Sequence, residues 1–365
     1  MNISTKLSAM LMATMMALPT MAAEKATVKV TPIAQDADAA NGGIIYALPK
    51  TVVQIRLTAQ VVVSTVGPYF QYSTRFLNLT DIVTENSIKW RLIGAEITTT
   101  GQADYSRRFK ISSDDRQLPQ LSLNADGTIA AINATQPSPA ATATHKPDPE
   151  IKYADLSQAP LSQSILSRTS KAAMAEECAM TIYSLRAARV GIITGAAENR
   201  LPDAGSMQQA LANIDRLERQ HVELFAGRRD TITVTRIVEV TPDYNGASNT
   251  VPARFSETAG FTDAMDLSGK PIYVDMEFDD SARVNDASQA KKQADQQTGL
   301  RYMIPGNVTI KVMDRNILLT QKTIHCTQNG QIATLPAAQT LTNSICFDPS
   351  TGAITSIGKT EKNNL

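Results

Sequence analysis

The sequence predicts an α+β fold in which two related β-rich units flank an inserted pair of long helices. Three observations predict it. Residues 43–136 and 228–365 contain segments with the alternating pattern of half-buried strands, such as residues 51–65, which are rich in β-branched residues. Between these regions, over residues 151–227, apolar residues recur every three to four positions, as on helix faces. Two short motifs of the first β-rich region also return in the second, which indicates related units of antiparallel or mixed sheets.

The N-terminus has the pattern of a cleavable signal peptide. Lys6 precedes an apolar run over residues 7–21, and small residues suited to signal peptidase follow. The run is too short for a membrane-spanning helix, and no later run reaches the roughly 20 apolar residues that a span needs. We therefore expect an exported protein without a transmembrane segment, in which residues 1–23 are removed and residues 24–42 form a flexible lead. We expect it in the periplasm, with the cell surface as the alternative.

The first β-rich unit, residues 43–136, is predicted to contain four strands, a short helix and a hairpin. The hairpin turns at Asp126-Gly127, where glycine supplies the positive φ of the turn. The helix follows the break at Gly67-Pro68. The strands are expected at 43–50, 51–65, 87–100 and 107–112, the helix at 69–79 and the hairpin at 121–132.

The middle of the chain is predicted to be a linker followed by two helices. Residues 137–150 are rich in proline and are typical of a linker. Apolar periodicity predicts one helix over 169–194 and a second from Ser206. Gly195 and Gly227 follow the two helices, where a left-handed residue commonly ends a helix.

The second β-rich unit, residues 228–365, is predicted to contain mainly strands. A polar stretch at 279–298 separates its early strands from its late ones. The strands are expected at 230–240, 271–278, 302–313, 316–326, 331–335, 344–347 and 353–357.

The repeated motifs relate the two β-rich units. Gly43-Ile-Ile-Tyr-Ala-Leu-Pro-Lys-Thr-Val52 aligns with Gly299-Leu-Arg-Tyr-Met-Ile-Pro-Gly-Asn-Val308, and Gly, Tyr, Pro and Val coincide. The segment 121–132 resembles 345–357, with one residue inserted at the turn. We interpret the pairs as an internal duplication. The alternative is coincidence between common turn patterns.

Several motifs together resemble a known family. They are Ile44-Ile-Tyr-Ala-Leu-Pro-Lys-Thr51, Ile193-Thr-Gly-Ala-Ala-Glu-Asn199, Leu224-Phe-Ala-Gly227 and Tyr302-Met-Ile-Pro-Gly306. In this order they resemble an uncharacterised exported family typical of the Bacteroidetes, domain of unknown function 4831. The resemblance covers most of the mature chain. It implies an envelope location and a mixed β and helical build, and it brings no activity and no catalytic residues.

Composition and motifs exclude several functions. Lys plus Arg equals Asp plus Glu, at 35 each, so no basic excess favours nucleic acid as a partner. The Gly-x-Ser-x-Gly elbow and the P-loop motif are both absent from the sequence. Only His145, His221 and His325 are available for a triad or a metal site. We therefore predict no catalytic residue, cofactor or metal, and expect His221 to be a core-edge histidine with one hydrogen-bond partner.

Three aromatic residues are the candidate binding residues. Tyr69 and Tyr72 follow Gly67-Pro68, and Trp90 lies nearby in the sequence. They could line an edge that binds a partner or ligand. The alternative is a short helix that packs its aromatic face on a sheet.

Two covalent modifications are also candidates. Cys326 and Cys346 could form a disulfide in an oxidising compartment, and free buried thiols are the alternative. Ser281, within Asp280-Ser-Ala, resembles the acceptor pattern for O-linked glycans in Bacteroidetes envelopes.

These observations favour a non-enzymatic binding or scaffold protein whose partner is an envelope protein or glycan. Acidic pairs such as Asp114-Asp115 leave open an enzyme that acts on glycans or peptidoglycan through carboxylates. Two acidic side chains facing each other across a concave pocket would favour that alternative. A third interpretation is a structural partner of an outer-membrane assembly, which would present an exposed apolar patch or an unpaired sheet edge.

Overall fold

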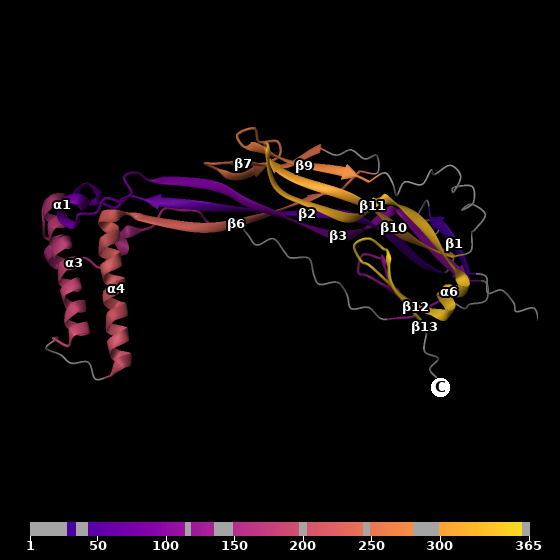
Figure 1. Ribbon diagram of the computed structural model, residues 1–365, viewed down its shortest axis with the longest axis horizontal. Helices are drawn as coiled ribbons and strands as arrows, with labels where there is room; N and C mark the ends of the chain where they lie inside the picture. Colours follow the sequence, from indigo (N-terminus) through magenta and orange to yellow (C-terminus); the bar gives the residue numbers. More distant parts are fainter. Residues whose placement is uncertain are drawn as a thin grey trace, which may run out of the picture.

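A computed structural model describes residues 28–33, 43–113, 118–134, 149–196, 203–243, 249–279 and 299–359. The molecule is elongated, and its long strands run along its longest axis (Figure 1). The two longest helices lie at one end of these strands and run across the strand direction. All strand pairs in the three sheets are antiparallel. The predicted α+β class with antiparallel sheets is therefore confirmed.

The first sheet has the strand order β1-β3-β2-β6. β2 (Ile44–Thr65) pairs with β3 (Ser87–Ser113) over almost its whole length, and β6 (Arg228–Val240) pairs with β2 from Val53 onward. Pro49 does not interrupt β2, because at that point the strand has a neighbour on one side only. The strands predicted at 43–50 and 51–65 are therefore one strand.

Two further departures from the prediction concern the ends of this sheet. β1 (Val28–Ile33), which lies within the expected flexible lead, pairs with the last residues of β3. β3 itself joins the two strands predicted at 87–100 and 107–112. It does so through a bulge, because the partner of Ala47 is Arg108 whereas the partner of Leu48 is Asp104.

The second sheet lies on one face of the first and has the order β11-β10-β9-β7-β8. Leu57 in β2 and Ile310 in β10 are fully buried in the apolar core that the two sheets share. The expected strands at 316–326 and 331–335 are the single strand β11. The strands are β7 (Asn249–Ser256), β8 (Gly260–Asp263), β9 (Lys270–Phe278), β10 (Gly299–Asp314) and β11 (Ile317–Pro336).

A buried polar contact also joins these two sheets. β11 bulges between its two paired halves, and this bulge holds Thr327 and Gln328. The backbone N–H of Thr51 donates to the Thr327 hydroxyl at 2.9 Å, and the Gln328 amide donates to the Thr51 carbonyl at 2.8 Å. The polar groups satisfy one another, so their burial is tolerated.

The third sheet combines two hairpins from distant parts of the chain, in the order β13-β12-β5-β4. Ile132 of one hairpin pairs with Ile345 of the other. The predicted turn at Asp126-Gly127 is present, and Gly127 has a φ of 84°. The elements are β4 (Leu121–Leu123), β5 (Ile129–Ile132), β12 (Asn343–Phe347) and β13 (Ile354–Lys359), with α6 (Ala337–Thr342) between β11 and β12.

The helices form a separate core at the other end of the first sheet. Tyr69, Cys178, Ile182 and Phe225 are buried together in it. None of the helices in the described ranges is long and apolar enough to cross a membrane. The elements are η2 (Phe70–Tyr72), α1 (Ser73–Leu77), η3 (Leu156–Gln158), α2 (Gln163–Leu166), α3 (Lys171–Thr194) and α4 (Ala204–Ala226).

The ends of α3 and α4 follow ordinary capping chemistry. The side chains of Ser170 and Asp203 accept hydrogen bonds from the first turns of α3 and α4. Gly195 and Gly227 follow the helices with φ values of 72° and 75°, which glycine adopts without strain.

Candidate functional site

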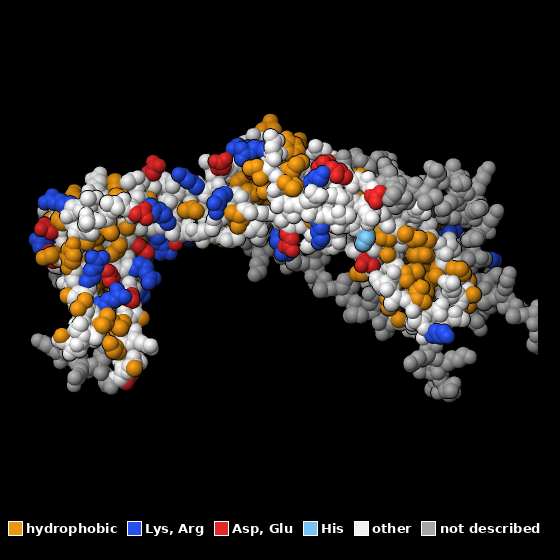
Figure 2. All heavy atoms as spheres, in the orientation of Figure 1, with side chains coloured by type: hydrophobic (Ala, Val, Ile, Leu, Met, Phe, Trp, Pro, Cys, Tyr) orange, Lys and Arg blue, Asp and Glu red, His pale blue; other side chains and the backbone are white. Residues whose placement is uncertain are grey.

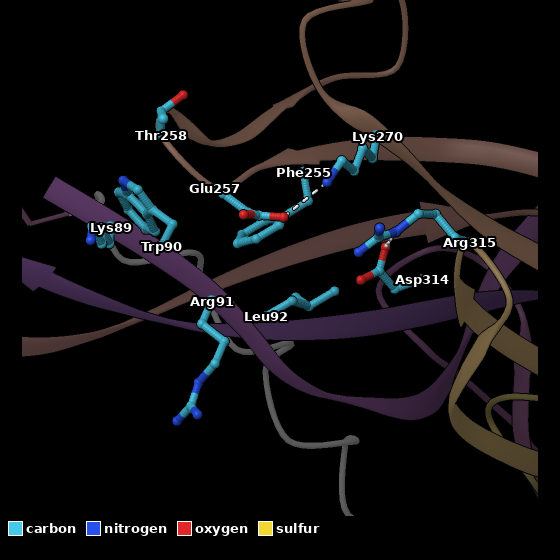
Figure 3. Close-up of a pocket in the computed structure, with 10 residues that line it drawn as sticks. All are labelled: Lys89, Trp90, Arg91, Leu92, Phe255, Glu257, Thr258, Lys270, Asp314 and Arg315. Carbon is cyan, nitrogen blue, oxygen red and sulfur yellow. Dashed lines mark hydrogen bonds and ion pairs between the residues drawn. The ribbon is translucent and has the colours of Figure 1, made fainter.

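Trp90 borders a groove between the first and second sheets, which we call the Trp90 groove. It has a volume of about 520 Å³. Trp90 lies at one end of it and the Asp314–Arg315 pair at the other, while the Arg91 side chain points away (Figure 3). The lining comes from β3, from β7 and the turn that follows it, from the start of β9, and from the end of β10 and the turn to β11. It consists of Lys89, Trp90, Arg91, Leu92, Phe255, Glu257, Thr258, Lys270, Asp314 and Arg315.

The indole of Trp90 is positioned by backbone contacts from the second sheet. The backbone N–H of Trp90 donates to the Glu257 carbonyl at 2.8 Å. Gly260 packs directly against the ring, because a Cβ at that position would lie 2.9 Å from two indole carbons. Its φ of 79° also favours glycine. The half-buried indole is therefore held in place by a close backbone approach.

The apolar part of the groove continues the core of the molecule. Phe255 is only 5% exposed and packs edge-on against Phe261, with ring centroids 5.4 Å apart. Leu92 is half-buried against the same core. These contacts fix the apolar lining before any ligand binds.

The rim of the groove carries two ion pairs. The Lys270 ammonium is 2.9 Å from a Glu257 carboxylate oxygen, and the Arg315 guanidinium is 3.4 Å from Asp314. The hydrogen bond from Lys270 lowers the pKa of Glu257. The two pairs offer both hydrogen-bond donors and acceptors, and Lys89 and Arg91 add two further cations to the lining of the groove.

The structure separates Trp90 from the two tyrosines that were grouped with it. Tyr69 is 4% exposed and packs on Phe225 in the helical core, with ring centroids 5.5 Å apart. Tyr72 lies beside Phe76, with centroids 6.1 Å apart. Neither tyrosine lines the Trp90 groove. The groove residues Phe255, Lys270 and Arg315 had no local pattern in the sequence that marked them.

The three cysteines are free thiols in the structure. Cys326 is buried between the first two sheets, and its thiol donates to Gln328 at 3.1 Å. Cys346 is half-buried on β12. The burial of Cys178 raises its pKa to about 12. Ser281, the candidate glycan acceptor, lies outside the described residues, as do residues 1–23 and 137–148.

Within the described ranges, no group of three or more His, Cys, Asp or Glu side chains is arranged to hold a metal ion. His221 is buried on α4, and its Nδ1 lies 2.8 Å from the Leu217 carbonyl oxygen. This is the single hydrogen-bond partner expected of a core-edge histidine.

The fold and the groove define a sheet-rich α+β protein that pairs a long antiparallel sandwich with a helical end. The model of one family, described as "Domain of unknown function (DUF4831)", matches residues 42–355. The chain belongs to this family. No curated protein and no solved structure matches the chain.

Proposed function

We propose that the protein is an exported, non-enzymatic binding protein of the cell envelope and that the Trp90 groove holds its ligand. The observation that carries the proposal is the preformed groove itself. Its volume of about 520 Å³ lies within the range of small-molecule sites. Its lining combines apolar and aromatic side chains with polar groups, as small-molecule sites usually do. The signal-peptide pattern at residues 1–23 supports export.

We propose a neutral oligosaccharide as the ligand. A sugar ring has one apolar face of C–H groups and an edge of hydroxyls. The half-buried Trp90 indole offers apolar surface for the face. The Lys270–Glu257 and Arg315–Asp314 pairs offer donors and acceptors for the hydroxyls.

The carboxylates of the groove support binding over hydrolysis. Glu257 and Asp314 are the acidic side chains that line it, and each is bound to a cation. A general acid in a glycosidase needs a raised pKa. The pKa of Glu257 is instead lowered by its hydrogen bond with Lys270. This observation argues against a carboxylate pair acting as acid and base at this site.

Trp90 provides a direct experiment, because it is the single tryptophan of the chain. Neutral envelope oligosaccharides are titrated into the mature protein while its intrinsic fluorescence is recorded. We expect a saturable change in emission. Arg315→Ala should weaken binding about tenfold through the loss of a charged hydrogen-bond donor. Arg75→Ala, on α1, is the control and should bind as the wild type does. The proposal fails if no oligosaccharide changes the emission, or if Arg315→Ala binds unchanged.

A second candidate function is that of a structural partner in an envelope assembly. Exposed apolar side chains on α3 favour it, since Met180, Tyr183, Val190 and Ile193 are 62%, 48%, 58% and 59% exposed. Their spacing places them along one side of the helix. Val190→Glu should release the protein from its envelope complex on a native gel while its melting temperature stays unchanged. Retention in the complex would contradict this function.

We also propose that the two β-rich units arose by duplication. Gly43 and Gly299 align in the repeated motifs; Gly43 precedes β2 and Gly299 begins β10, with φ values of 127° and 155°. The backbone N–H of Ala47 donates to the Gly127 carbonyl at 3.0 Å. Its counterpart Met303 donates to the Gly352 carbonyl at 3.4 Å.

These matching contacts join each long strand to the turn of its own hairpin, which supports a common origin. A crystal structure should superpose residues 43–52 with 121–132 on 299–308 with 345–357. Failure to superpose would contradict the duplication.

A further inference from the structure

A second concave site lies where α4 meets β6, and we call it the arginine pocket. Gly227 turns the chain between the last helical residue and the first strand residue. The helix and the strand therefore meet at a sharp angle (Figure 1). The pocket has a volume of about 410 Å³. Its lining is Arg216, Arg219, Gln220, Glu223, Gly227, Arg228, Arg229 and Asp230.

Two of its arginines are fixed by ion pairs. The Arg228 guanidinium is 2.8 Å from Asp230 and 4.0 Å from Glu223. The Arg229 guanidinium is 2.9 Å from Asp81. These pairs fix both guanidinium groups while leaving each side chain nearly half exposed.

The other two arginines have no acidic partner in the described part of the chain. Arg186 and Arg189 of α3 are both paired with Glu218, at 2.7 and 3.9 Å. Arg216 and Arg219, in contrast, face solvent from α4. Figure 2 shows basic side chains gathered on the helical pair close to its junction with the strands. The four arginines and two carboxylates of the lining leave an excess of two positive charges.

Gln220 adds an unsatisfied acceptor to this lining. Its side-chain oxygen Oε1 is buried, and no donor reaches it among the described residues. A buried acceptor without a donor costs free energy. Rotation of the Gln220 side chain toward the pocket would let a ligand hydroxyl or amine donate the missing hydrogen bond.

We propose that the arginine pocket binds a phosphate or sulfate ester whose carrier has a hydroxyl or amine next to the anion. Every cation of the lining is an arginine. The planar guanidinium group of arginine can donate two parallel hydrogen bonds to two oxygens of one phosphate or sulfate, whereas the lysine ammonium acts as a point charge. The carrier is either a soluble phosphorylated or sulfated sugar or the headgroup of an anionic lipid. The site is separate from the Trp90 groove and does not depend on the function proposed for that groove.

The experiment uses the mature full chain and two probes. Inorganic phosphate and sulfate are titrated by calorimetry, and pelleting is measured with vesicles of phosphatidylglycerol and phosphatidylcholine against vesicles of phosphatidylcholine alone. Arg216→Ala/Arg219→Ala should weaken anion binding at least about tenfold, because both unpaired guanidinium groups are lost. Arg216→Lys/Arg219→Lys keeps the positive charges but removes both planar guanidinium groups, so this variant should also bind anions more weakly than the wild type.

The control is Lys270→Ala/Arg315→Ala, which removes two positive charges from the Trp90 groove and should bind anions normally. Binding of the free anions without pelleting supports a soluble ligand. Pelleting with phosphatidylglycerol that is lost in Arg216→Ala/Arg219→Ala supports a lipid headgroup. The proposal is overturned if neither probe binds, or if binding persists unchanged in that variant. It is also overturned if the control loses binding to the same extent.

Discussion

The hydroxyl of Tyr46 lies between the backbone N–H and C=O groups of Arg301. It accepts a hydrogen bond from the N–H at 2.9 Å and donates to the carbonyl oxygen at 3.2 Å. The two residues belong to β2 and β10, 255 positions apart in the chain, and Tyr46 is 1% exposed. The hydroxyl of Tyr46 therefore hydrogen-bonds two backbone groups and links the first sheet to the second.

Tyr46→Phe should destabilise the protein by about 1–3 kcal/mol. The substitution leaves the shape of the core intact but removes the partner of both Arg301 backbone groups. Tyr105→Phe is the control, since Tyr105 is 67% exposed and its change should cost less than about 0.5 kcal/mol. Urea denaturation of both variants measures the difference. Equal stability of the two would contradict the importance of this contact.

Alkaline pH should weaken the same contact. Burial raises the pKa of Tyr46 far above its usual value of 10.0, although the hydrogen bond with the Arg301 backbone opposes this in part. Above about pH 10 the unfolded chain releases this proton while the folded chain keeps it, so the free energy of unfolding falls as pH rises. Denaturation at pH 8 to 11 should show the gap between wild type and Tyr46→Phe narrowing. A constant gap would contradict the raised pKa.

Gly260→Ala should disturb the Trp90 groove as well as the turn. Gly260 and Gly127 have similar φ values, 79° and 84°, so alanine costs about 1–2 kcal/mol at either position. Only at Gly260 does the added Cβ meet a side chain, the Trp90 indole, at 2.9 Å. Gly260→Ala should therefore cost at least about 1 kcal/mol more than Gly127→Ala and should alone shift the tryptophan emission. Equal costs and unchanged emission would contradict the packing.

The thiols should all titrate as free groups. Ellman's reagent on the unfolded, unreduced protein should count all three cysteines, and Cys346→Ser should count one fewer. In the folded protein, burial raises the pKa of Cys178 and Cys326, so these two should react slowly at pH 8. Half-buried Cys346 should react first. A count of one thiol in the unfolded protein would mean that Cys326 and Cys346 are bridged.

Local chemistry explains which elements the sequence predicts well. The turn at Asp126-Gly127 and the glycines after the two long helices, Gly195 and Gly227, all have positive φ. A single residue type decides such positions, so a short stretch of sequence is sufficient.

Other elements exist because of distant partners. β1 lies in a polar lead and becomes a strand through its pairing with β3. β7 contains Pro252 and β8 has four residues, and both are held by their neighbours in the second sheet. Strand formation at such sites depends on context more than on propensity.

The candidate site also has one part that the local sequence predicts and another part that depends on distant segments. The aromatic residues near Gly67-Pro68 predict Trp90 as a binding residue. The same pattern also predicts Tyr69, which instead packs in the helical core. The companions of Trp90 in the groove, such as Phe255 and Arg315, come from strands much later in the chain. No spacing rule links residues that only the packing of two sheets brings together.

The third sheet can be completed only late in folding. Its middle pair joins β5 to β12, and β12 is synthesised much later than β5, because Ile345 pairs with Ile132. Until β12 emerges, the hairpin of β4 and β5 has an open edge and only part of its apolar cover. Open edges recruit strands from other molecules, and pairings between distant segments form slowly. A chain that stops before residue 343 would keep that edge unpaired. The pairing of β12 with β5 therefore protects the folding molecule from aggregation through this edge.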